Sequence, residues 1–143
     1  MTLIRDPLVQ EVIGCAIAVH RSLGPGLLEG ANERCLAIEF RHKQISYTSQ
    51  VAVPLQYRGI DAGCAYRVDF LVEGWLVVEV KSVERLLPIH TAQVLTYLHL
   101  LDVPQGLLIN FNGEKLKDGL KSVINKRHAS FGQAATTNVL HEK

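Results

Sequence analysis

Apolar side chains recur at helical spacing in three parts of the chain. Asp6-Pro7 is typical of a helix N-cap followed by proline at the first helical position, and Gly24-Pro25-Gly26 predicts the end of that helix. Further helices are predicted over 28–43 and from 88 to about 101. In the first helix the residues at helical spacing are Val9, Val12, Ile13, Ala16, Ile17 and His20. The core stripes of the other two are predicted to be, in order, Leu28, Ala31, Cys35 and Ile38; and Ala92, Leu95, Leu98 and Leu101.

Strand patterns occupy the stretches between these helices. The segments 51–57, 65–72, 76–81 and 105–111 are predicted to be strands, with Pro54 indicating an edge position or an irregularity in the first. The amphipathic segment from Leu116 to Ile124 is predicted to be a helix. The order αα-βββ-α-β-α predicts an α/β fold with a mixed four-stranded sheet flanked by helices. The long connection before the fourth strand permits a parallel crossover.

Charged residues interrupt two of these apolar strands. Asp69 lies in the second strand, and Glu79 and Lys81 share one face of the third. If Glu73-Gly74-Trp75 is a three-residue loop, Asp69 lies directly opposite Glu79. A two-residue loop would instead place Asp69 opposite Val78.

Two carboxylates that face each other across a strand pair repel, unless one binds a proton or a cation lies between them. Mg²⁺ or Mn²⁺ fits such oxygen ligands best. Lys81 beside that ion would position a water or stabilise negative charge. The alternative is a solvated ladder of ion pairs that includes Arg67. The apolar character of the third strand favours a functional cluster.

Two other groups of polar residues are candidates for the same site. His90, Gln93 and Tyr97 share a helix face, where Gln and Tyr can orient a phosphate or a water. An ordinary polar flank of a helix is the alternative. Glu29 falls in the first turn of its helix after a glycine-rich turn, where the helix dipole alone would stabilise a carboxylate.

Together these residues resemble a known superfamily. Asp69 followed by Glu79-Val80-Lys81 is similar to the D…ExK signature of the PD-(D/E)XK nuclease-like superfamily, and the segment from Gln93 to Tyr97 resembles the QxxxY motif of its exonuclease-like branch. From about 12 to 124 the chain more closely resembles small bacterial GxxExxY proteins. That likeness is carried by Gly24-Pro25-Gly26-Leu27-Leu28-Glu29, Tyr66-Arg67-Val68-Asp69, Val78-Glu79-Val80-Lys81, Ile89-His90-Thr91-Ala92-Gln93, Leu95-Thr96-Tyr97-Leu98 and Gly106-Leu107-Leu108-Ile109-Asn110-Phe111.

The resemblance implies a restriction-endonuclease-like core and a metal site. Asp69 and Glu79 would bind Mg²⁺ or Mn²⁺, with the Val80 carbonyl as a further ligand. Lys81 would orient the attacking water or help to deprotonate it. Glu29 would complete the acidic cluster.

The supporting residues implied by the resemblance lie on the third helix. Gln93 and Tyr97 would position a metal-bound water or a phosphate, with His90 beside them. The reaction would be hydrolysis of phosphodiester bonds in single- or double-stranded DNA. Asn32 departs from the resemblance, because the family name implies tyrosine there. Its amide can still form hydrogen bonds, so a supporting role would be altered rather than lost.

Composition adds limits on partners and surroundings. The 143 residues, 48% hydrophobic with a net charge of +1, suit one domain over 1–126 and a polar, flexible tail over 127–143. No secretory signal or membrane span is visible, so a cytoplasmic protein is expected. Cys15, Cys35 and Cys64 are widely spaced, which predicts buried, inert thiols in a reducing compartment.

The low net charge also bears on nucleic-acid binding. No arm rich in lysine or arginine is present to hold a duplex, although a bound divalent ion would reverse the sign of charge locally. This motivates a second hypothesis, a catalytically silent nuclease-fold module that acts in protein or nucleic-acid binding. A homodimer is a further expectation, because small members of such folds often need a second subunit to span DNA.

Overall fold

The first helix follows its predicted boundaries closely. A computed structural model describes residues 5–130 of the chain. In it α1 (Pro7–Leu23) begins after Asp6, whose Oδ1 accepts a hydrogen bond from the Leu8 N–H at 2.8 Å. Helix α1 ends at Gly24, where φ is 71°. Its predicted N-cap, first-position proline and glycine stop are therefore confirmed.

The second helix begins and ends within one residue of its predicted bounds but has a different buried face. Helix α2 (Glu29–His42) buries Asn32, Leu36 and Phe40, whereas Leu28 is 81% and Ile38 is 55% exposed. The predicted stripe through Leu28, Ala31, Cys35 and Ile38 is wrong. Two apolar stripes run along this helix one residue apart, and the stripe that ends in the large ring of Phe40 is the one docked on the sheet.

The sheet contains five strands in the order β1-β2-β3-β4-β5 within the described residues. Only the β3–β4 pair is parallel, and α3 (Pro88–Leu101) forms the crossover between these two strands. The other neighbours are antiparallel. The strands are β1 (Tyr47–Tyr57), β2 (Ile60–Val72), β3 (Leu76–Lys81), β4 (Gln105–Asn110) and β5 (Leu120–Ile124). The predicted mixed sheet is thus confirmed, with one strand more than expected.

The extra strand replaces the helix predicted from Leu116 to Ile124. That segment forms a short 3₁₀ helix, η2 (Leu116–Gly119), followed directly by β5 on the free edge of β4. A Cβ at Gly119 would lie 2.4 Å from the Asn110 carbonyl oxygen, so the close approach of the two segments requires glycine there. The free edge of β4 offers backbone hydrogen bonds to a partner strand. Pairing with this edge makes the end of the segment a strand, although its amphipathic pattern predicts a helix.

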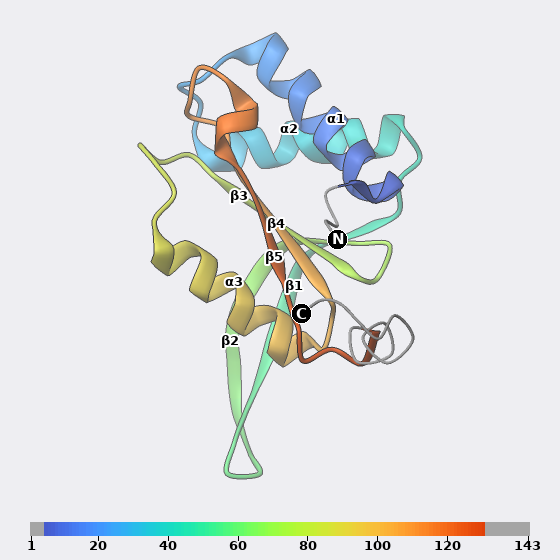
Figure 1. Cartoon of the computed structure of the whole chain (residues 1–143), viewed down its shortest axis with the longest axis vertical. Helices are drawn as coiled ribbons and strands as arrows, with labels where there is room; N and C mark the ends of the chain where they lie inside the picture. The colour runs from blue at the N-terminus through green and yellow to red at the C-terminus, as the bar shows by residue number, and fades with distance from the viewer. Residues whose placement is uncertain (1–4, 131–143) are drawn as a thin grey trace.

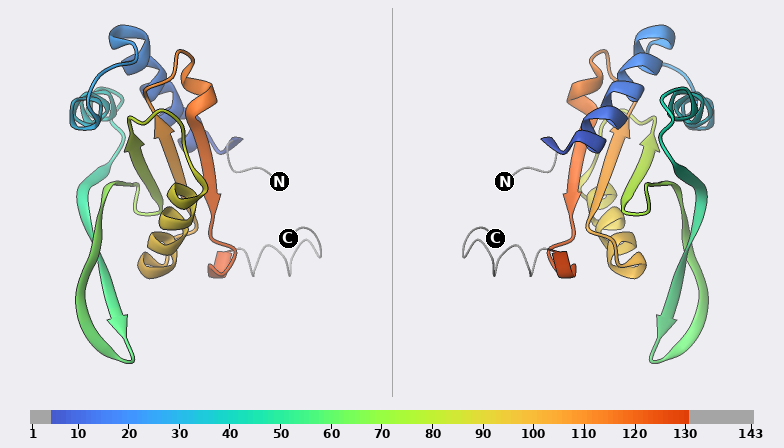
Figure 2. Two further views of the ribbon diagram at one scale, coloured as in Figure 1. Left: turned by 90° about the vertical axis from the view of Figure 1, so that its left-hand side faces the viewer. Right: turned by 90° about the vertical axis from the view of Figure 1, so that its right-hand side faces the viewer.

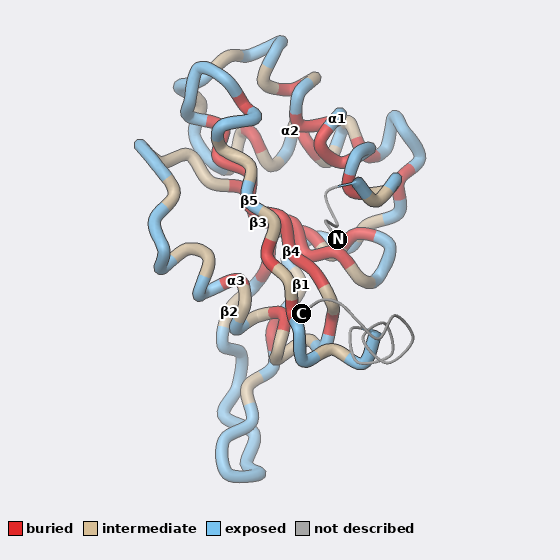
Figure 3. Tube along the Cα trace, in the orientation of Figure 1, coloured by how far each residue is buried: buried red, intermediate tan, exposed pale blue. Residues whose placement is uncertain are grey.

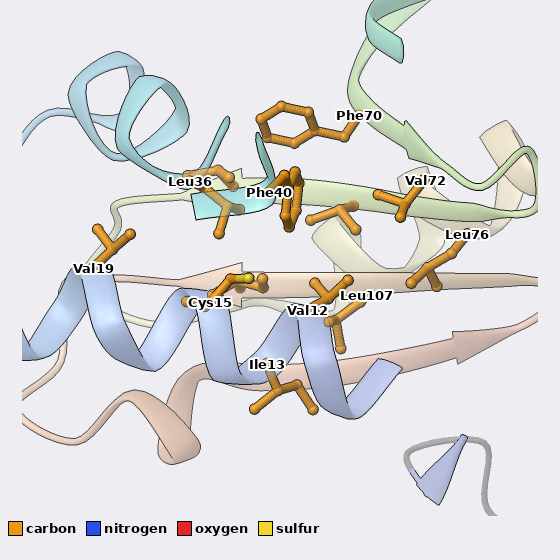
Figure 4. Close-up of a cluster of buried hydrophobic side chains, with 14 of the residues drawn as sticks. Val12, Ile13, Cys15, Val19, Leu36, Phe40, Phe70, Val72, Leu76 and Leu107 are labelled. Atoms are coloured by element: carbon orange, nitrogen blue, oxygen red, sulfur yellow. The ribbon is translucent and has the colours of Figure 1, made fainter. Parts of the chain in front are cut away.

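Helices cover both faces of the sheet, and each face has its own apolar core. The first core joins α1 and α2 to the sheet, and Figure 4 shows its side chains interleaving. Within it the rings of Phe40, Tyr47 and Phe70 pack with centroids 5.1–5.5 Å apart. The second core joins α3 to the opposite face through Val94 and Leu98. Ala92, predicted to face inward, is exposed.

A hairpin formed by β1 and β2 extends beyond the rest of the sheet. Figures 1 and 2 show it projecting from the body, and Figure 3 shows that its outer half is exposed. β1 is an edge strand whose register shifts on both sides of Pro54, which confirms the prediction for that proline. The two-residue loop at the tip, Arg58 (φ 52°) and Gly59 (φ 77°), has the positive φ angles of a type I′ turn.

The three cysteines are free thiols in different surroundings. Cys15 is buried, and burial raises the pKa of its thiol to about 11. Cys35 is half-buried and Cys64 is exposed on the projecting hairpin. The prediction of uniformly buried thiols is therefore wrong for Cys64. Across residues 5–130, no helix combines the length and the apolar character needed to cross a membrane.

Candidate active site

The turn between β2 and β3 sets the register of the site. Val72 pairs with Leu76, so Glu73, Gly74 and Trp75 form a three-residue loop, closed by a hydrogen bond of 3.1 Å from the Trp75 N–H to the Val72 carbonyl. The two-residue alternative is excluded. Regular pairing continues to Phe70 and Val78, and the next step along the strands brings Asp69 beside Glu79.

Where β2 and β3 separate, the carboxylates of Asp69 and Glu79 take the place of backbone carbonyls as hydrogen-bond acceptors. The Asp69 N–H donates to Glu79 Oε2 at 2.7 Å, and the Val80 N–H donates to Asp69 Oδ2 at 2.8 Å. Each carboxylate thus accepts a hydrogen bond from the backbone of the opposite strand. Both carboxylates therefore lie in the gap between β2 and β3, in a crossed arrangement that we call the carboxylate crossing.

Burial makes the negative charge at the carboxylate crossing costly. Glu79 is only 1% exposed, and burial followed by repulsion from Asp69 raises its pKa to about 8. Burial also raises the pKa of Asp69 to about 6, opposed by its hydrogen bond from the Val80 N–H. The solvated ladder of ion pairs is wrong, because Glu79 is buried and Arg67 donates to the Gln50 carbonyl, at 3.4 Å.

Lys81 ends β3 two residues after Glu79. Alternation along β3 places Leu76, Val78 and Val80 in the core under α1 and α2, so Glu79 and Lys81 face the α3 side together. The positive charge of Lys81 lowers the pKa of Glu79, although less than burial and Asp69 raise it. The lysine is therefore electrostatically coupled to the carboxylate crossing.

Two glutamates of α2 extend the acidic cluster. Glu29 Oε2 accepts a hydrogen bond of 3.2 Å from the N–H of Ser82, which directly follows β3. Glu29 and Glu33 both raise the pKa of Asp69 by repulsion, so their carboxylates lie near it. The first turn of α2 thereby reaches the end of β3, and the structure brings Glu29 to the predicted cluster.

The three polar residues of α3 separate into different positions. His90 Nδ1 accepts a hydrogen bond of 2.9 Å from the Leu87 N–H, so His90 caps the start of the helix. Tyr97 stacks on Tyr66 of β2 with ring centroids 4.5 Å apart. Burial and the Glu79 charge raise the pKa of Tyr97, which therefore borders the site. Gln93 is exposed one turn before Tyr97.

Three residues near the carboxylate crossing were not predicted. Gln50 of β1 donates to Asp69 Oδ1 at 3.4 Å and to Glu33 Oε2 at 2.6 Å. The Tyr66 hydroxyl donates to Glu79 Oε1 at 3.4 Å. The register that brings Gln50 opposite Asp69 includes two shifts around Pro54, so it could not be extended from the hairpin turn by sequence pattern alone. Tyr66 lies in the segment Tyr66-Arg67-Val68-Asp69 that carries the family resemblance, whereas no sequence signal identifies Glu33.

Asn32 is the one buried polar residue of α2. It is 1% exposed, its Nδ2 donates to the Leu27 carbonyl at 3.5 Å, and its Oδ1 has no hydrogen-bond partner. This bond is long, so the amide is weakly held. Asn32 therefore faces the core beneath the loop that leads to Glu29, rather than the acidic cluster.

The donor set of the carboxylate crossing suits a hard divalent cation. Two carboxylates that repel each other in a partly buried gap gain from a cation between them. A strand residue points its N–H and C=O to the same side, so the Val80 carbonyl also faces this gap. Within residues 5–130, no three His, Cys, Asp or Glu side chains already stand together as a metal-binding group. The fit is therefore to Mg²⁺-like ions, which use one or two carboxylates and complete their shell with water and substrate phosphate.

One protein family matches almost the whole described part of the chain. The family described as the PD-(D/E)XK nuclease superfamily matches residues 6–123. The match spans α1 to β5 and contains the whole acidic cluster with Lys81. The chain belongs to the PD-(D/E)XK nuclease superfamily, and its α/β architecture agrees with a restriction-endonuclease-like fold. Comparisons with curated proteins and with solved structures found no match.

Proposed function

We propose that this protein is a metal-dependent nuclease that hydrolyses phosphodiester bonds of DNA. The observation that carries the proposal is the carboxylate crossing of Asp69 and Glu79, with Lys81 on the same face of β3 as Glu79. A buried carboxylate beside a half-buried one, both with raised pKa values, is typical of functional sites. Membership of the nuclease superfamily supports the same conclusion.

The proposed site divides binding and positioning among the chain's residues. Asp69, Glu79 and the Val80 carbonyl hold Mg²⁺ or Mn²⁺, and Glu29 adds negative charge beside them. Lys81 orients the attacking water and stabilises the negative charge that develops on the phosphate. When bound, the cation polarises the phosphate and lowers the pKa of water.

The chemical step is an in-line hydrolysis. The water oxygen forms a bond to phosphorus, the bond from phosphorus to the leaving oxygen breaks, and that oxygen takes up a proton. The proton of the water passes to solvent, assisted by Lys81. Tyr97 borders the site, and we assign to it and to Gln93, one turn earlier on α3, the positioning of the phosphate or the water. The finer resemblance to GxxExxY proteins assigns the same residues to this reaction.

A cleavage assay on the full chain tests the proposal. We expect labelled single- or double-stranded DNA to be cut with Mg²⁺ or Mn²⁺ and to stay intact with EDTA. Glu79→Gln and Lys81→Met should each slow cleavage by about a hundredfold or more, because the first weakens the cation site and the second removes the positive charge beside the phosphate. Glu114→Gln and Lys115→Met, which change exposed residues in the loop after β4, are matched controls and should cleave normally.

Two outcomes would contradict the nuclease. Cleavage that survives Glu79→Gln and Lys81→Met together would come from a contaminant. If no cleavage occurs and calorimetry detects no Mn²⁺ binding at millimolar concentration, the fold acts instead as a catalytically silent binding module. Comparing the two DNA substrates in the same assay also identifies the preferred strandedness.

A further inference from the structure

Gln50 occupies an unusual backbone conformation in the middle of β1. Its neighbours Ser49 and Val51 pair regularly with Phe70 and Val68, which places Gln50 opposite Asp69. Gln50 nevertheless has a φ of 52°, in the left-handed region that residues with a side chain rarely adopt. Such strain inside a strand is typical of sites where a side chain must be held in a particular place.

The amide of Gln50 bridges two carboxylates from different elements. Nε2 donates to Glu33 Oε2 of α2 at 2.6 Å and to Asp69 Oδ1 of β2 at 3.4 Å. The other oxygen of Asp69 accepts from the Val80 N–H at 2.8 Å. Asp69 is therefore held from both sides, by the backbone of β3 and by the side chain of Gln50.

A neutral amide suits this place better than a cation. Glu33 and Asp69 repel each other, and a primary amide has two N–H groups that can satisfy both without cancelling their charge. A lysine or arginine here would neutralise Asp69 and compete with a divalent cation. Glycine would remove the backbone strain at this positive φ. The advantage of glutamine at position 50 is therefore its side-chain amide.

We propose that Gln50 is a positioning residue that fixes the Asp69 carboxylate for a divalent cation and ties Glu33 to it. This inference rests on the proposed nuclease function and adds a neutral residue, Gln50, that supports its acidic cluster. Gln50 touches neither the phosphate nor the attacking water, and it acts through Asp69.

Replacing Gln50 by glycine separates the side chain from the strained backbone. Gln50→Gly should unfold at the same temperature as the wild type or a few degrees higher, because glycine adopts positive φ readily. The same variant should bind Mn²⁺ about tenfold more weakly by calorimetry. It should lower kcat about tenfold and leave KM for DNA within about twofold. Gln50→Ala keeps the strained backbone and should show the same loss of Mn²⁺ affinity.

Gln56→Ala is the matched control, because Gln56 lies exposed on the same strand beyond Pro54. It should leave Mn²⁺ affinity and cleavage unchanged. A metal-free readout is the amide resonance of Val80, whose N–H donates to Asp69. That resonance should shift and exchange faster with solvent in both Gln50 variants, and it should stay in place in Gln56→Ala.

The two readouts distinguish the two ways to fail. If the wild type binds Mn²⁺ and cleaves DNA but the Gln50 variants match it, the positioning role is overturned and the nuclease stands. If the wild type neither binds Mn²⁺ nor cleaves DNA, the nuclease is wrong and so is the role toward a cation. An unchanged Val80 resonance in both Gln50 variants would overturn the positioning of Asp69 itself.

Discussion

The two ends of the β2–β3 pairing differ sharply within a few residues. From Val72 to Phe70 the strands pair backbone to backbone, and the side chains of Phe70 and Val72 enter the core beneath α1 and α2. One residue further, the carboxylates of Asp69 and Glu79 accept the backbone hydrogen bonds in place of carbonyls. The paired end stabilises the fold through backbone hydrogen bonds and buried apolar side chains. At the carboxylate crossing the backbone N–H groups also have hydrogen-bond acceptors. Burial there disfavours the negative charge of the two carboxylates.

The largest effect on stability is expected at the paired end. Phe70→Ala removes the ring that packs against Phe40 and Tyr47, and should lower the free energy of unfolding by about 4 kcal/mol. Urea unfolding measures this loss. Ile60→Ala on the same strand is the control, since Ile60 is 70% exposed and should cost less than about 0.5 kcal/mol. Equal losses in the two variants would contradict the comparison.

The carboxylate crossing should behave in the opposite way. The Glu79 pKa is about 8 in the folded protein against 4.5 for the free side chain, so the folded state binds the extra proton and loses stability as the pH rises from about 4.5 to 8. Glu79→Gln removes this dependence. Without metal it should raise the free energy of unfolding by about 3 kcal/mol at pH 9, allowing for relaxation of the buried site, and change it little at pH 4.

Urea unfolding of both proteins in EDTA across this pH range provides the measurement. Mg²⁺ at millimolar concentration should stabilise the wild type more than Glu79→Gln, because a cation relieves the charge that the substitution deletes. A wild type whose stability stays flat from pH 5 to pH 9 would show that Glu79 is not held in a costly ionised state.

The smallest effect sharpens the same comparison. Tyr66→Phe removes a hydrogen bond of 3.4 Å to Glu79 and keeps the ring stacked on Tyr97, so it should lower stability by about 0.5 kcal/mol. That hydrogen bond lowers the pKa of Glu79, so its loss should move the midpoint of the pH dependence upward. Unfolding of Tyr66→Phe against pH measures both changes, with Tyr57→Phe on the exposed hairpin as the control. A midpoint that moves down would contradict this contact.

Local chemistry explains which parts of the molecule could be predicted from its sequence. Asp6-Pro7 and Gly24 set the limits of α1 whatever packs against it, and three residues between two apolar strands set the register that brings Asp69 to Glu79. Features that depend on tertiary packing were not predicted from the sequence. The buried face of α2 depends on Phe40 finding the sheet, and the strand state of 120–124 depends on the free edge of β4.

The candidate site divides in the same way. Asp69, Glu79 and Lys81 stand out because charge is unexpected in apolar strands. Gln50 and Glu33 do not stand out, since an exposed glutamine and a helix-surface glutamate are ordinary in sequence. They become part of the site only when β1 and α2 meet around Asp69. Polar residues that act through other residues therefore need a three-dimensional structure to be found.

The projecting β1–β2 hairpin makes the chain tolerant of added length at one point. Its tip, Arg58-Gly59, is exposed, and the strand residues beyond Pro54 pair only with each other. Neither apolar core contains a residue from this outer half. A peptide epitope or a small domain inserted between Arg58 and Gly59 would leave both cores and the carboxylate crossing intact. The tip therefore offers a handle by which this protein can be labelled or immobilised while it is assayed.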